Sequence, residues 1–141
     1  MITPQKMLEM FPSFRGVEFA DSSYAVPDYD WLITEFFSYY TEFMRKFNAF
    51  EWRTSHDCDD KARTFCVLAS LAHGQKTRPA EGIAIGEVWY YSQRLGGYHA
   101  INAAFASKKK HQPELVFIEP QVPAVISLTD QEKQSIFKAR F

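Results

Sequence analysis

The sequence has few cysteines, no long apolar run and no excess of charge of either sign. It contains 2 cysteines, 16 basic residues and 17 acidic residues. A disulfide-stapled scaffold is dense in cysteine, a membrane helix needs about 20 consecutive apolar residues, and nucleic-acid-binding domains usually carry a basic surface. These absences therefore argue against a nucleic-acid partner, against a membrane partner and against a disulfide framework.

The N-terminus and the cysteines indicate a cytoplasmic location. Residues 1–6 lack the apolar core of a secretory signal peptide. If Cys58 and Cys66 share one helix, they lie about 12 Å apart along its axis, whereas a disulfide needs Cα atoms closer than about 7 Å. We therefore expect two free thiols.

The chain has ample material for one hydrophobic core. It has 141 residues, of which 46% are hydrophobic and 16% are aromatic. A domain of this size can fold without a metal or a disulfide. With no repeat and no linker in the sequence, we expect a single domain over residues 1–141.

Periodicity predicts an α+β fold with helices packed on an antiparallel sheet. Apolar residues at helical spacing predict helices from Pro4, over 28–47 and over 58–73, the last with Asp57 at its N-cap and Gly74 as its stop. Residues rich in strand formers predict strands over 82–92, 98–105 and 115–119. Residues 17–27 and 124–128 could each hold one more strand. A capping box starting at Thr129 suggests a short helix, and 135–141 could instead form an edge strand.

Three residues with complementary chemistry are expected to meet. A hairpin that turns symmetrically about Lys109 places His99 opposite Glu119. Cys58 opens the predicted helix, where the helix N-terminus and an imidazolium both favour the thiolate. A carboxylate on the far ring nitrogen orients the histidine. This pattern predicts a nucleophile, Cys58, a base, His99, and an orienting group, Glu119.

Other interpretations of the same residues compete with this one. Asp57, Asp59 and Asp60 place negative charge beside Cys58, which opposes the thiolate. A metal could use the cysteine with nearby histidines and carboxylates, but the spacing typical of zinc sites is missing, so we expect no metal and no cofactor. Cys66 falls on the apolar stripe of its helix and is expected to be a packing residue. The lysine run 108–110 is expected to be a solvated turn.

The motifs around these residues resemble a known family. Asp57-Cys58-Asp59-Asp60-Lys61-Ala62, then His99-Ala100-Ile101, then Ile118-Glu119-Pro120-Gln121 follow the order found in the bacterial transglutaminase-like cysteine proteinases. The similarity covers about residues 55–121 and implies a papain-like or transglutaminase-like fold with the nucleophile at a helix N-terminus. That family more usually has aspartate at the position of Glu119, and often an aromatic residue at the position of Lys61.

The sequence therefore predicts a thiol-dependent acyl-transfer enzyme, most simply a hydrolase of peptide or other amide bonds with a Cys58-His99-Glu119 triad. Gln121 and Trp52 are predicted to line the substrate cleft, and the partner is a peptide, a protein or another amide-containing molecule. The alternative is a catalytically inactive binding or assembly domain that uses aromatic residues such as Trp89, Tyr90 and Tyr91 as a contact surface. An exposed aromatic strand would favour this alternative.

Overall fold

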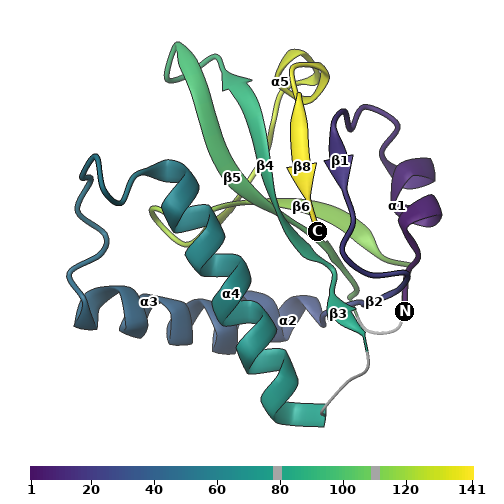
Figure 1. Cartoon of the computed structure of the whole chain (residues 1–141), viewed down its shortest axis with the longest axis horizontal. Coiled ribbons are helices and arrows are strands. Elements are labelled where there is room, and N and C mark those ends of the chain that lie inside the picture. The colour runs from purple at the N-terminus through teal and green to yellow at the C-terminus, as the bar shows by residue number, and fades with distance from the viewer. Residues whose placement is uncertain (78–80, 109–111) are drawn as a thin grey trace.

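A six-stranded sheet forms the centre of the protein. The computed structural model describes residues 1–77, 81–108 and 112–141. Helices lie against the sheet, with α4 running diagonally across it and α1 beside β1 (Figure 1). The strand order is β1 (Val17–Glu18), β8 (Lys138–Arg140), β4 (Ile85–Ser92), β5 (Gly97–Ala106), β6 (Glu114–Glu119) and β7 (Ala124–Ile126). Two further short strands, β2 (Tyr24–Ala25) and β3 (Gly82–Ile83), pair with each other in parallel.

The sheet is mixed, so the prediction of an antiparallel sheet is wrong. Strands β4, β5, β6 and β7 pair antiparallel in that order, and β4 also pairs antiparallel with β8. In contrast, β1 pairs parallel with β8 through Val17–Ala139 and Glu18–Arg140. The sequence signals of hairpins identify only strands that follow each other along the chain. A parallel pair between the two ends of the chain carries no such local signal, which is why it was not predicted.

The N-terminal helices follow the predicted pattern, with one irregularity. Helix α1 (Pro4–Met10) is capped by the hydroxyl of Thr3. The predicted helix over 28–47 is continuous but has three parts: α2 (Tyr29–Trp31), the π-helical segment η1 (Leu32–Phe36) and α3 (Phe37–Lys46). The Asp28 side chain accepts a hydrogen bond from the Trp31 amide at 2.9 Å, which explains where the helix starts.

The later helices confirm one predicted boundary and correct another. Helix α5 (Asp130–Gln134) begins with the capping box formed by Thr129 and Glu132. Helix α4 (Cys58–Thr77) was predicted to stop at Gly74, but it continues through it. A Cβ at that position would meet nothing within 4 Å, so the glycine reflects no close approach of another segment. Glycine in a helix interior weakens the helix without ending it.

Two hydrophobic cores lie on the two sides of the central strands. Even-numbered side chains of β5, such as Ala104, pack with the helices from η1 to α4, and odd-numbered ones, such as Phe105, pack with α1 and the C-terminal strand. The helical core centres on Phe65, whose ring makes edge contacts with Phe36 and Tyr40, each at 4.9 Å between ring centroids. The aromatic stripe of residues 28–47 is therefore core, as predicted.

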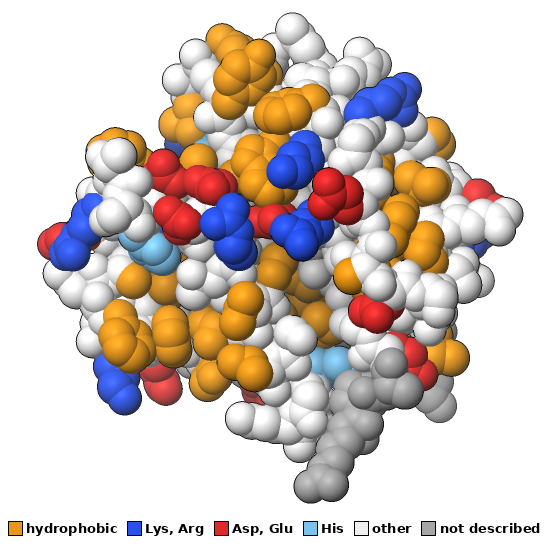
Figure 2. All heavy atoms as spheres, viewed as in Figure 1, with side chains coloured by type: hydrophobic (Ala, Val, Ile, Leu, Met, Phe, Trp, Pro, Cys, Tyr) orange, Lys and Arg blue, Asp and Glu red, His pale blue; other side chains and the backbone are white. Residues whose placement is uncertain are grey.

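The surface carries charges of both signs close together. In Figure 2, acidic and basic side chains mix in one band across the visible face, with apolar side chains on either side of it. Arg63 pairs with Asp59 at 3.2 Å and with Asp60 at 3.3 Å in this way. Among the described residues, no helix has the length and apolar character that crossing a bilayer requires.

Candidate functional site

Cys58, His99 and Glu119 meet at the N-terminus of α4. Cys58 is the first residue of that helix, and its interaction with His99 lowers the pKa of its thiol. On its other side, His99 contacts Glu119, with 2.7 Å between His99 Nε2 and Glu119 Oε2. His99 and Glu119 are buried, with 3% and 5% of their surfaces exposed, while Cys58 is half-buried. The structure thus brings together the three residues that the sequence singled out.

The strand register that was used to place them is wrong by two residues. The β5–β6 ladder pairs Ala106 with Glu114 and Asn102 with Ile118, so the hairpin is not centred on Lys109. Continuing this register would place Glu119 opposite Ile101 rather than opposite His99. A shift of two preserves the side of the strand on which a side chain lies. The histidine and the carboxylate therefore meet diagonally, beyond the last pair of the ladder.

Glu119 is held in place from both sides. Its Oε1 accepts a hydrogen bond from the Gln121 amide at 3.0 Å, which leaves Oε2 for the histidine. The Tyr40 hydroxyl donates to the Pro120 carbonyl at 3.0 Å and ties the turn after β6 to helix α3. The Tyr90 ring packs edge to face against the His99 ring, with 6.0 Å between the ring centroids. The carboxylate and the imidazole therefore have fixed orientations.

The electrostatics of the cluster favour a thiolate beside an imidazolium. The hydrogen bond with His99 lowers the pKa of Cys58 below its usual value, although partial burial opposes this. Burial alone would lower the pKa of His99, but hydrogen bonds to Cys58 and Glu119, with the attraction of their charges, raise it to about 9. Each partner stabilises the charged form of the other.

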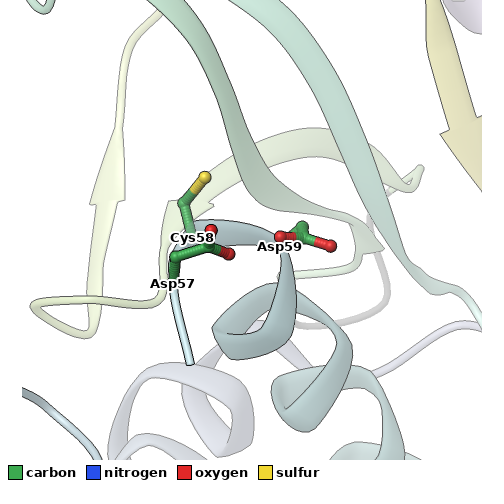
Figure 3. Close-up of side chains that lie close together, drawn as sticks. All are labelled: Asp57, Cys58 and Asp59. Atoms are coloured by element: carbon green, nitrogen blue, oxygen red, sulfur yellow. The ribbon is translucent and has the colours of Figure 1, made fainter. Parts of the chain in front are cut away.

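The aspartates beside Cys58 oppose the thiolate less than the sequence suggested. A hydrogen bond between Asp57 and Asp59 raises the pKa of Asp57 and lowers that of Asp59. Arg63 pairs with both Asp59 and Asp60. Figure 3 shows the Cys58 sulfur directed away from the Asp57 and Asp59 carboxylates. Asp59 and Asp60 are thus paired with Arg63. The charge of Asp57 still raises the pKa of Cys58, as the smallest of the influences on it.

Among the residues that the structure describes, one group could hold a metal ion, and it includes Cys58. Asp57, Cys58 and Asp59 have ligand atoms within 4.8 Å of one another. His99 is not part of this group, and its Nε2 is already engaged by Glu119. The carboxylates are explained by their bond to each other and by Arg63, so we assign no metal to them.

Lys61 fixes the loop that leads into α4. It is fully buried, and its ammonium donates to the carbonyl of His56 at 3.1 Å and to that of Glu51 at 3.4 Å. Burial lowers the pKa of this ammonium. Its position departs from the aromatic residue of the resembled family, and its role here is to hold the segment before Cys58.

The second cysteine lies in a different environment. The Cys66 sulfur accepts a hydrogen bond from the Asn102 side-chain amide at 3.2 Å, and burial raises the pKa of its thiol to about 12. The neutral thiol at Cys66 serves as an internal reference for the reactivity of Cys58.

The remaining predicted residues are dispersed. Gln121 lies two residues beyond Glu119, and its side chain lines a groove beside α3. Trp52 is 66% exposed in the loop before α4, and its assignment as a cleft wall stays a prediction. Of the lysine run 108–110, residues 109 and 110 lie outside the described residues. The Lys108 ammonium lies 4.4 Å from the centroid of the Tyr29 ring.

A cluster of exposed aromatic rings was only partly predicted. Of the three aromatic residues proposed as a contact surface, Tyr90 is buried, Trp89 is half-buried and Tyr91 is 44% exposed. Tyr91 pairs across β4 and β5 with Tyr98, which is 75% exposed, and Tyr98 contacts Phe137, which is 48% exposed. The alternation of β5 could have identified Tyr98, because it precedes the buried His99. Phe137 comes from a distant segment and had no local signal.

Comparison with known proteins identifies similar folds but no family. No protein-family model matches the sequence, and no curated protein matches it at a significant level. Among solved structures, one described as a PSL1a–E64 complex is similar with a TM-score of 0.71 and 17% identity, covering 97% of this chain and 48% of that one. Another is the Polyporus squamosus lectin bound to the human-type influenza-binding epitope Neu5Acα2-6Galβ1-4GlcNAc, with a TM-score of 0.68 and 18% identity, covering 95% of this chain and 46% of that one.

These neighbours correct the family and the function predicted from the sequence. The chain resembles two solved structures, one of them described as a lectin, and spans about half of their length. The assignments as a transglutaminase-like cysteine proteinase, as a papain-like or transglutaminase-like fold and as a hydrolase with a catalytic triad are therefore wrong. A motif such as Asp57-Cys58-Asp59-Asp60 specifies a capped helix start carrying a thiol, and such a start is compatible with more than one fold and more than one function.

Proposed function

We propose that this chain is a binding domain that holds its ligand on the cluster of exposed aromatic side chains formed by Tyr91, Tyr98 and Phe137. This is the alternative that the sequence left open. The observation that carries it is the exposure of these rings on β4, on β5 and just before β8, because large apolar groups in water are the usual anchors of a contact surface. Ring centroids 5.6 Å apart for Tyr91 and Tyr98 and 5.4 Å apart for Tyr98 and Phe137 make one continuous cluster.

The cluster is rigidly supported, which favours binding. The Tyr91 amide donates to the Ser135 hydroxyl at 2.9 Å, and the same hydroxyl donates to the Tyr91 carbonyl at 3.3 Å. The Phe137 amide donates to the Trp89 carbonyl at 3.1 Å. These three bonds fasten the segment that follows α5 to β4. A surface that is ordered before binding loses less conformational entropy when the ligand arrives.

A glycan is the ligand class that we propose for this cluster. One of the two similar structures supports this choice, because it is described as a lectin bound to a sialylated trisaccharide. Sugar rings present flat faces of C–H groups that can pack on aromatic rings. The hydroxyls of Tyr91 and Tyr98 can donate to sugar oxygens at the margin of the same surface.

The test is binding of Neu5Acα2-6Galβ1-4GlcNAc, measured by isothermal titration calorimetry. We expect Tyr98→Ala to weaken binding by about tenfold or more, the effect typical of a central aromatic anchor. Tyr39→Ala, which removes a tyrosine that is 42% exposed in helix α3, is the matched control and should leave the affinity unchanged. Failure of the trisaccharide to bind, or equal affinity in wild type and Tyr98→Ala, would contradict the proposal.

A second role is favoured by one specific observation. His99 interacts with Cys58 on one side and with Glu119 on the other. We propose that Cys58 is an activated nucleophilic thiol, that His99 holds its proton as an imidazolium, and that Glu119 orients His99. The buried histidine and the half-buried cysteine support this assignment, since a ligand can reach the sulfur but solvent does not surround the ion pair. E64, which one similar structure contains, is a suitable probe: protection of Cys58 from alkylation by E64 would support a ligand site there.

A further inference from the structure

A groove lies between helix α3 and the turn that follows β6. It has a volume of about 750 Å³. One wall is formed by side chains of η1 and α3, and the other by Gln121, Val122 and Pro123. The groove is separate from the aromatic cluster on β4 and β5. Its first residue on the turn, Gln121, lies two positions beyond Glu119.

The groove has a row of polar side chains beside an apolar lining. Its apolar lining consists of Ile33, Phe37, Phe50, Val122 and Pro123. The polar side chains Thr34, Ser38, Thr41 and Arg45 follow one another along the helix at intervals of three and four residues, so they lie on one face. From Thr34 to Arg45 this face extends about 16 Å at 1.5 Å per residue.

The hydroxyls in this row are not equivalent. The Thr34 hydroxyl donates to the Asp30 carbonyl one turn earlier, at 2.6 Å. Serine and threonine hydroxyls in helices commonly make this bond. Within the described part of the chain, Ser38 and Thr41 have no such partner. Their hydroxyls are therefore available to a ligand, and Thr41 lies one turn before Arg45, towards that end of the groove.

Arg45 supplies a cation at that end. Over the residues that the structure describes, no acidic side chain forms an ion pair with it, in contrast to Arg53 and Arg63, which pair with acidic side chains at 2.8 Å and 3.2 Å. A guanidinium binds a carboxylate with two parallel hydrogen bonds, and a neighbouring hydroxyl can satisfy a further lone pair. The π-helical segment at the other end is a further indication, because π-helical turns are frequent at functional sites.

We infer that this groove binds a small amphipathic carboxylic acid, with the carboxylate on Arg45 and Thr41 and the apolar body over Phe37 and Phe50. The opposite charge of Arg45 selects the carboxylate, and the apolar lining selects the body. The inference does not depend on glycan binding by the aromatic cluster, because the two sites share no residue.

The test compares octanoate with octanamide, which has the same apolar body without the charge. Binding is followed by two-dimensional ¹H–¹⁵N NMR titration of the whole chain. We expect octanoate to shift amide signals of η1, α3 and residues 121–123, and to bind about tenfold more tightly than octanamide. Arg45→Gln should abolish this difference, and Thr41→Val should reduce it severalfold. Lys46→Gln, a neighbouring cation that does not line the groove, is the control and should change nothing.

Three results would overturn the inference: no saturable shifts with octanoate, equal affinity for octanoate and octanamide, or shifts confined to residues outside the groove. Loss of octanoate binding in both Arg45→Gln and Lys46→Gln would also overturn it, because it would indicate a general charge effect. Glycan binding that is lost in Tyr98→Ala but retained in Arg45→Gln would show that the aromatic cluster and the groove bind their ligands independently.

Discussion

Cys58 is expected to react with iodoacetamide at a lower pH than an ordinary cysteine thiol, which ionises near pH 8.5. The hydrogen bond with His99 lowers the pKa of Cys58, and the pKa of His99 is raised to about 9. The thiolate–imidazolium pair therefore exists between the lowered pKa of Cys58 and the raised pKa of His99. It loses its imidazolium as the pH rises through about 9. Mass spectrometry of the alkylated chain as a function of pH measures this directly, and Cys66, with a pKa of about 12, should stay unmodified as the internal reference.

Two substitutions separate the contributions to this reactivity. His99→Gln removes the hydrogen-bonding cation and should move the labelling profile of Cys58 to that of an ordinary thiol or above it. Glu119→Gln keeps the shape of the side chain but removes the charge that stabilises the imidazolium, so it should move the profile in the same direction by a smaller amount. Glu87→Gln, a buried glutamate near Cys66 on β4, is the matched control and should leave the Cys58 profile unchanged.

One labelling result would contradict the activation of Cys58. A labelling profile of wild-type Cys58 centred at or above the free-thiol value, and unaffected by Glu119→Gln, would mean that Cys58 is an ordinary thiol. The cluster would then be a buried structural arrangement, and only the aromatic surface would remain as a candidate ligand site.

Phe65→Ala is expected to lower the free energy of unfolding by about 3–5 kcal/mol, the usual range for loss of a buried phenylalanine. Phe65 is fully buried, and its ring contacts Phe36, Phe37 and Tyr40. Removing the ring leaves a cavity between α4 and the helix formed by η1 and α3. These aromatic neighbours are bulky and cannot easily collapse into the space.

Urea denaturation followed by circular dichroism measures this change. Val67→Ala is the control on the same helix, because Val67 is 54% exposed and its truncation should change stability by less than about 1 kcal/mol. If Phe65→Ala were as stable as Val67→Ala, the helical core would not be organised around Phe65. The position of Cys58 at the start of the same helix would then lose its main support.

Local signals in the sequence predicted the elements that depend on neighbouring residues. The cap at Thr3, the start of the second helix at Asp28 and the capping box at Thr129 all satisfy backbone groups within three residues, so their residue types identify them. The meeting of His99 and Glu119 was also anticipated, because the even shift in register kept both side chains on the side of the strand that had been expected.

Features that depend on distant segments were not predictable in the same way. The parallel pairing of Val17 with Ala139 and the contact of Phe137 with Tyr98 join segments whose partners are not specified by any adjacent turn. The π-helical segment at 32–36 has ordinary helix-forming spacing, so its sequence does not distinguish it from an α-helix. The family resemblance failed for a related reason, since the motif around Cys58 describes one helix start and not the arrangement of the sheet.

The position of β8 has a consequence for how the chain folds during synthesis. Because β8 lies between β1 and β4, the sheet cannot close until residues 138–140 have left the ribosome. Until then the first strand has no partner, and β4 presents an open edge on that side. Ordering such long-range contacts last makes folding slow and leaves an unpaired edge exposed to other nascent chains. Chaperone dependence should therefore fall sharply once the final strand emerges, whereas the hairpin of β4 and β5 can form much earlier.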